Sequence, residues 1–196
     1  EALARLATVA ARRGDLAAAE GALTEARSLE RADWPPRLRE RFAFSRMYVS
    51  GNLGDAQRVK TDLCSLIEIS ESAGFDASAA VGRAGLADAA LQAGEVDEAI
   101  VSGERAVALL LQLDFPTVFG TTLANLCAAL LVAGRTGAAR DAAARALPVL
   151  QVNGYAGLLR SHFALLAAQL ERWGEAAALL GASDRWYADE QSQREP

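Results

Sequence analysis

Apolar residues recur along most of the chain at the spacing of an amphipathic helix. Leu86, Ala89, Ala90 and Ala93 occupy positions i, i+3, i+4 and i+7, and residues 106–113 repeat this pattern. No alternating run of β-branched residues indicates a strand. The pattern therefore predicts an all-α chain, with helices at residues 2–13, 16–31, 36–50, 53–72, 76–93, 96–113, 116–133, 136–152, 156–170 and 173–190.

A short glycine-led motif separates the helical runs. It reads GDLAAA from Gly14, GNLGDA from Gly51, GEVDEA from Gly94 and GRTGAA from Gly134, and a degenerate copy, ERWGEA, starts at Glu171. Because glycine adopts the left-handed conformation that closes a helix, each glycine is predicted to end one helix and to open the turn to the next. An alanine that lets two helices approach closely stands five residues after each glycine: Ala19, Ala56, Ala99 and Ala139.

A second marker recurs between these motifs. The aromatic residues Trp34, Phe75, Phe115 and Tyr155 are 41, 40 and 40 residues apart, and we expect them to pack as wedges against the preceding helix pair. Two markers with a period of about 40 residues predict a stack of about five antiparallel helix pairs, because one pair cannot bury its own apolar face. We expect one repeat domain over residues 1–196, with units at about 1–32, 33–73, 74–113, 114–153 and 154–191.

Composition narrows the classes of function. The chain has 196 residues, 52% of them hydrophobic, and a formal net charge of −5, which argues against a nucleic-acid-binding surface. No stretch approaches the run of about 18 apolar residues that a membrane span needs. The first residues form no signal peptide and include no initiator Met, so we expect a segment of a longer, cytoplasmic protein. Cys64 and Cys127 are predicted to be buried, reduced thiols inside helices.

The residues that usually carry catalysis or bind metals are sparse. His162 is the only histidine, and no acid lies within one helical turn of it. A zinc site needs more ligands than one histidine and two distant cysteines supply, and the sequence contains no phosphate-binding glycine loop. The acidic group Glu95, Asp97 and Glu98 falls in the first turn of a helix, where carboxylates favour the helix dipole. We expect no enzyme activity, no metal and no cofactor.

The repeated motif resembles the tetratricopeptide repeat. The resemblance rests on the glycine, the residue two positions later, the alanine five positions later, and a leucine and small residue upstream, in a unit longer than the usual 34 residues. Periods near 40 are similar to the C-terminal regions of MalT-like and LuxR-type regulators and of related signal-transduction ATPases. The segment AAALLGASDRWYADE (residues 176–190) is similar to a helix that often closes such ATPase regulators.

The resemblance implies a right-handed α-solenoid whose inner face binds a peptide, a partner protein or a small effector, with any enzymatic parts upstream in the parent chain. In that family the first helix of each pair lines the groove. The corresponding candidates here are Leu38, Arg41, Ser45, Tyr48, Val81, Asp88, Leu91 and Thr121. The Lys/Asn clamp for peptide C-termini is absent, so an amphipathic helix or a mixed apolar ligand fits better.

Two alternatives to a groove ligand stay open. Arg41, Tyr48 and Asp88 could make only local, solvated contacts. The chain could also be a structural arm that self-associates through its end repeats as a homo-oligomer, because it lacks an obvious polar capping helix.

Overall fold

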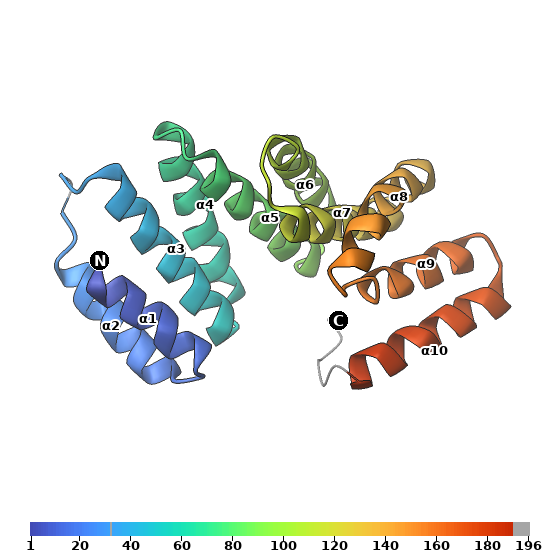
Figure 1. The fold of residues 1–196 in the computed structure, drawn as a ribbon, viewed down its shortest axis with the longest axis horizontal. Helices are drawn as coiled ribbons and strands as arrows, with labels where there is room; N and C mark the ends of the chain where they lie inside the picture. Colours follow the sequence, from blue (N-terminus) through green and yellow to red (C-terminus); the bar gives the residue numbers. More distant parts are fainter. Residues whose placement is uncertain (32, 190–196) are drawn as a thin grey trace. The chain divides into compact units, whose positions relative to one another are not determined.

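The computed structural model describes residues 1–31 and 33–189, and every regular element in these two ranges is a helix (Figure 1). The predicted all-α fold is therefore confirmed, with ten helices in the predicted order. Their bounds are α1 (Ala2–Arg12), α2 (Leu16–Ser28), α3 (Pro36–Leu53), α4 (Ala56–Ser72), α5 (Asp76–Gln92), α6 (Val96–Leu110), α7 (Pro116–Val132), α8 (Thr136–Val152), α9 (Leu158–Gln169) and α10 (Trp173–Asp189). None of them is long and apolar enough to cross a membrane.

The chain forms two compact units, one spanning Glu1–Ala89 and one starting at Ala90. In the first unit, α1 packs beside α2 and α3 packs beside α4 (Figure 1). The core of this unit has an alanine-rich part around α1 and α2, into which Phe42 and Val49 of α3 insert. A second cluster gathers Leu63 and Ile67 of α4 with Leu86 of α5.

In the second unit, α7 packs beside α8 and α9 beside α10. Its core is centred on α7, where Leu123, Cys127 and Leu131 are almost completely buried. Helix α7 carries no charged residue at all, which agrees with its position inside the cluster, because a helix that is apolar on all sides is normally buried.

The turns between paired helices repeat with a period of 40 residues. Gly14, Gly54, Gly94 and Gly134 have φ angles of +77°, +70°, +76° and +72°. The amide of the residue after each glycine donates to a carbonyl five residues earlier, as in the bond from Glu95 to Ala90 at 2.8 Å. This is the hydrogen bond of a Schellman motif, which satisfies the last carbonyls of the preceding helix. The turn prediction is confirmed at Gly14, Gly94 and Gly134.

The prediction for Gly51 is wrong. Helix α3 continues through Gly51 to Leu53, and Gly54 is the residue with the left-handed backbone. Asp55 then caps α4 by accepting a hydrogen bond from the amide of Arg58 at 3.0 Å. The motif GNLGDA contains two glycines, and the second is the one that an aspartate N-cap follows, as in Gly14-Asp15.

This shift of three residues also changes the packing position in the second helix pair. Ala19, Ala99 and Ala139 are buried as predicted, with at most 1% of their surface exposed, whereas Ala56 is exposed. Val59 takes the equivalent place, 40 residues after Ala19, and packs against the cluster of Leu63 and Ile67.

Two glycines in α5 allow close contact with α4. A Cβ atom added at Gly82 would lie 2.8 Å from Cγ1 of Ile67, and one added at Gly85 would lie 2.8 Å from Cδ2 of Leu63. Both glycines are therefore close-packing sites between α4 and α5. Any larger side chain at Gly85 would force Leu63, which is 1% exposed, out of its position.

The aromatic markers do not behave alike. Trp34 packs edge-on against Phe42, with ring centroids 5.9 Å apart, and Phe75 lies under the guanidinium of Arg37 at 3.8 Å. Phe115 and Tyr155 keep 41% and 45% of their surface exposed, so they cover the neighbouring helices only in part. Phe75 thus contacts its preceding helix pair through Arg37, whereas the ring partner of Trp34 lies on the following helix α3.

Glu171 is the one non-glycine residue with a positive φ, +59°, in residues 1–31 and 33–189. It occupies the turn between α9 and α10, where the amide of Arg172 donates to the carbonyl of Ala167 at 2.8 Å. A side chain in the left-handed region costs about 1–2 kcal/mol, which glycine avoids, although glycine loses more entropy on folding.

We expect Glu171→Gly to raise the free energy of unfolding by up to about 1 kcal/mol in urea titrations. Gly94→Ala should lower it by a similar amount, and equal effects of both substitutions would contradict this.

Candidate functional site

A pocket of about 590 Å³ lies in the first unit between α1, α3 and the start of α5. Helix α1 contributes side chains at i, i+1, i+4, i+5 and i+8, and α3 contributes side chains at i, i+3, i+4, i+7 and i+8. These spacings place each set on a single helix face. The lining residues are Glu1, Ala4, Arg5, Thr8, Val9 and Arg12, then Arg37, Glu40, Arg41, Phe44 and Ser45, and Ser78.

The carboxylate of Glu1 lies at one side of this pocket, where two arginines bind it. Oε1 of Glu1 accepts a hydrogen bond from Nη2 of Arg5 at 3.0 Å and another from Nη1 of Arg41 on α3. The three side chains remain about half exposed or more. Solvent therefore weakens each pair, because exposed ion pairs contribute only about 0–1 kcal/mol. The Glu1 carboxylate therefore holds the guanidinium groups of Arg5 and Arg41 close to each other, and both groups stay accessible to solvent.

A second carboxylate, that of Glu40, is buried in the pocket wall. Only 6% of Glu40 is exposed. Its Oε1 accepts a hydrogen bond from the hydroxyl of Ser78 at 2.5 Å, and its Oε2 lies 3.6 Å from Nη1 of Arg37. Arg37 also lies over the ring of Phe75 at 3.8 Å. The partners supplied by α3 and α5 make the burial of this charge tolerable.

The pocket also has a hydroxyl pair and an arginine held by an aromatic ring. Thr8 donates to the hydroxyl oxygen of Ser45 at 3.1 Å, and Ser45 donates to the carbonyl of Arg41 at 3.0 Å. The guanidinium of Arg12 lies 5.7 Å from the ring centroid of Tyr48, a cation–π arrangement. The guanidinium of Arg12 is oriented by this ring and is exposed to solvent.

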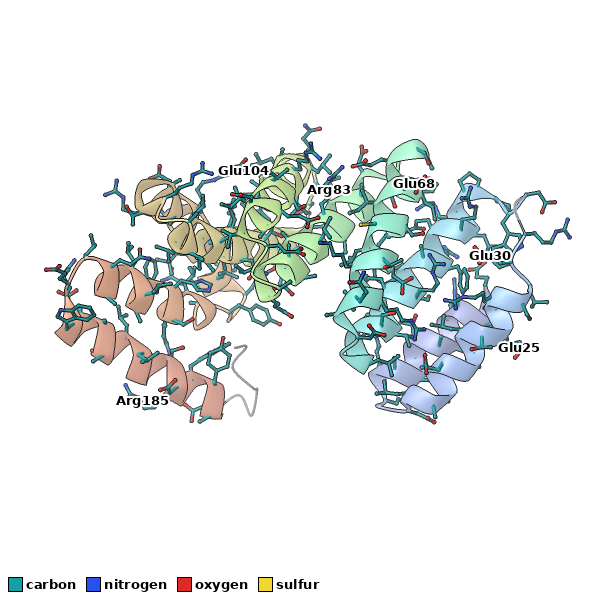
Figure 2. All side chains as sticks on the ribbon, turned by 180° about the vertical axis from the view of Figure 1, so that it is seen from behind. Glu25, Glu30, Glu68, Arg83, Glu104 and Arg185 are labelled. Carbon is teal, nitrogen blue, oxygen red and sulfur yellow. The ribbon has the colours of Figure 1, made fainter. Side chains whose placement is uncertain are left out.

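Charge is segregated between the helices of the first unit. Helices α1 and α3 together carry six arginines and one glutamate, whereas α2 and α4 carry five acidic and three basic residues. Glu25 of α2 and Glu68 of α4 point outward from these second helices (Figure 2). In a chain whose net charge is −5, the helices that line the pocket are therefore locally basic.

The structure brings only some of the predicted groove residues together. Arg41 and Ser45 line the pocket, and Tyr48 contacts its Arg12. Leu38, Val81 and Asp88 are partly buried in the same unit but do not line it. Leu91 packs against the core of the second unit, and Thr121 donates its hydroxyl proton to the carbonyl of Thr117 at 3.1 Å. Neither of these two residues lines the pocket described above.

The polar pocket residues that sequence reasoning missed include Glu1, Arg5, Arg12, Arg37, Glu40 and Ser78. A signal for the arginines was present, because six arginines in two first helices contrast with the uncharged α7. No sequence signal identifies Glu40, because its burial depends on partners that come from two different helices.

The acidic turn between α5 and α6 borders a shallower pocket of about 530 Å³, with Val132 and Ala133 on its other side. Within the described part of the chain, no three His, Cys, Asp or Glu residues form a group that could hold a metal ion. Burial raises the pKa of the Cys127 thiol to about 11 and lowers the pKa of His162 to about 4. At neutral pH both groups are therefore held in their uncharged forms.

Comparisons with known proteins identify the fold. No protein-family profile matches the sequence, and no curated protein matches it. Among solved structures, BtubC (BKLC) from P. vanneervenii matches with a TM-score of 0.75 and 17% identity, over 99% of this chain and 82% of that chain. A putative kinesin light chain from Podosopora anserina with nearly identical TPR-like repeats matches with a TM-score of 0.64 and 17% identity, over 98% of this chain and 96% of that one.

A single-substitution form of the latter protein matches with a TM-score of 0.66 and 17% identity, over 97% of this chain and 95% of that chain. At this level of identity the likeness concerns the fold alone. The chain therefore has the fold of tetratricopeptide-like repeat proteins, as the repeat pattern predicts.

Proposed function

We propose that the chain is a non-catalytic interaction domain that binds a peptide or protein segment in the pocket between α1 and α3. The observation that carries this proposal is the pocket itself. One face each of α1 and α3 converges on a space of about 590 Å³, which is within the range of ligand sites in proteins. The tetratricopeptide-like fold supports an interaction role, and burial holds the Cys127 thiol protonated, which does not favour thiolate chemistry.

Site-specific crosslinking tests this proposal. A photoreactive phenylalanine analogue replaces Phe44, which lines the pocket, and in a matched protein it replaces Glu25, which points outward from α2. Both proteins are exposed to one degenerate dodecapeptide library. We expect covalent peptide adducts at position 44 in clear excess over position 25. Equal yields at the two positions would contradict binding in the pocket.

A second candidate function is self-association through the C-terminal helices. Trp173 is 66% exposed, Leu170 54% and Leu180 39%, and exposed apolar groups of this size often mark interaction surfaces. Sedimentation velocity of the chain and of its Trp173→Glu variant distinguishes self-association from binding of a separate partner. A dimer that the variant loses supports the scaffold, whereas a monomer in both supports binding of a separate partner.

The role in a larger regulator is also a proposal. The similarity of residues 176–190 to the closing helix of signal-transduction ATPases supports a parent protein of the MalT-like or LuxR-type class. Both cysteines are free; Cys127 is buried as predicted, whereas the prediction of burial is wrong for Cys64, which is exposed on α4. Free thiols are compatible with the reducing cytoplasm. A phosphate-binding loop encoded upstream in the parent gene would support this assignment, and an upstream sequence without one would contradict it.

A further inference from the structure

We infer that the pocket between α1 and α3 is selective for acidic peptide segments, namely segments in which carboxylate side chains flank an apolar residue. This inference rests on the proposed function and assigns the chemistry of its ligand. Its first support is the charge balance, since four arginines and two glutamates line the pocket of a chain with a net charge of −5. The two glutamates offset only part of this excess, and they do so in different ways.

The position of each charge explains why. Glu40 is buried and is already paired with Ser78 and Arg37, so its charge is largely compensated inside the wall. Glu1 is about half exposed and is bound by Arg5 and Arg41. Its carboxylate demonstrates that these two guanidinium groups can bind one carboxylate together. A glutamate or aspartate of a ligand can take its place with the same two partners, because Arg donors match carboxylate geometry.

Apolar side chains that can contact a ligand lie beside the arginines on each helix. Arg5, Val9 and Arg12 stand at i, i+4 and i+7 of α1, and Arg37, Arg41 and Phe44 have the same spacing on α3. Each helix therefore presents two arginines and one apolar side chain on the face that lines the pocket. Val9 is 44% exposed and accessible to a ligand. A segment with acids on both sides of a leucine or similar residue would contact both kinds of group.

The second binding position for a carboxylate is Arg12. Its guanidinium lies 5.7 Å from the ring centroid of Tyr48, and Arg12 is exposed, so a carboxylate of a ligand can reach it. Arg12 is two helical turns from Arg5 on the same face of α1, a separation of roughly 10 Å at 1.5 Å per residue. Acidic residues about three positions apart in an extended segment span this distance.

Fluorescence anisotropy of the whole chain tests the inference. The probes are degenerate dodecapeptides of Ala, Leu, Ser and Gly that carry no, three or six Asp or Glu residues, a matched set with six Lys residues, and a 12-nucleotide uridine RNA. We expect affinity to rise at least tenfold from no acids to six, and to fall as salt rises from 50 to 300 mM because screening weakens the charge pairs. Arg12→Gln and Arg41→Gln should each weaken binding of the six-acid set about tenfold.

Arg39→Gln is the matched control, since it removes the same charge from α3 at an exposed position outside the pocket, and it should leave affinity within twofold. Glu1→Gln should strengthen binding of acidic peptides, because it removes the carboxylate that occupies Arg5 and Arg41. The inference is overturned if the affinity for peptides does not depend on the number of acidic residues, or if the lysine peptides or the RNA bind more tightly than the acidic peptides. It is also overturned if Arg39→Gln and Arg41→Gln change the affinity equally. If neutral peptides bind and crosslink at position 44, the proposed function stands while acidic selectivity fails; if no peptide binds or crosslinks, both fail.

Discussion

Replacing Asp62 with alanine is expected to lower the free energy of unfolding by about 3 kcal/mol, because it removes the centre of a buried polar network. Asp62 of α4 is 5% exposed. Its Oδ2 accepts a hydrogen bond from the hydroxyl of Ser50 at 2.7 Å, and its Oδ1 lies 3.3 Å from Nε of Arg46. Ser50 is completely buried and the side chain of Arg46 is 16% exposed. Both α3 residues would lose their charged partner on α4.

Urea denaturation followed by circular dichroism measures this effect. Glu68→Ala is the matched control, because it removes a carboxylate from an exposed site of the same helix, and it should change stability by less than about 0.5 kcal/mol. The double substitution Arg46→Met with Asp62→Leu should recover part of the loss, since well-packed apolar residues often replace a buried ion pair without cost, while Ser50 still lacks the acceptor that Asp62 provides. A loss for Asp62→Ala no larger than that for Glu68→Ala would show that the network does not stabilise the α3–α4 pair.

The location of the turns was largely predictable from the sequence because local chemistry determines them. A left-handed residue after a helical run is favourable only for glycine, so Gly14, Gly94 and Gly134 mark helix ends regardless of the rest of the fold. The error at Gly51 arose where two glycines, Gly51 and Gly54, compete within one motif. The aspartate that follows Gly54 and caps α4 distinguishes them, and this capping signal is also local.

The pocket was predictable only in part, because it depends on contacts between helices that are distant in the sequence. Arg41 and Ser45 were identified from their position on a first helix. Glu40 stands next to Arg41 in the sequence, but its burial requires Ser78 of α5, which is 38 residues away. The periodicity of a single helix does not encode such a partner. Leu91, which is also predicted from its position on a first helix, is partly buried against the core of the second unit, and its role in a groove stays a prediction.

Acidification is expected to destabilise the chain through His162, whose folded-state pKa is about 4 because burial disfavours its charged form. Its Nδ1 atom is buried and has no hydrogen-bond partner among the residues that the structure describes. The unfolded chain, in which the pKa is near 6.5, therefore binds the proton more readily than the folded chain. The stabilisation is fully present above pH 6.5 and is lost as the pH falls through the interval from 6.5 towards 4. At pH 5 the loss relative to pH 8 should reach about 2 kcal/mol.

The measurement compares urea denaturation at pH 8 and pH 5 for the chain and for His162→Phe, which keeps an uncharged ring at this position. The carboxylates are shared by both proteins, so their titration cancels in the comparison and the difference reports His162 alone. The variant should lose about 2 kcal/mol less than the parent chain between the two pH values. Equal losses in both proteins would mean that His162 accepts a proton in the folded state at its ordinary pKa, and that the space around α9 is open enough to hydrate the imidazolium.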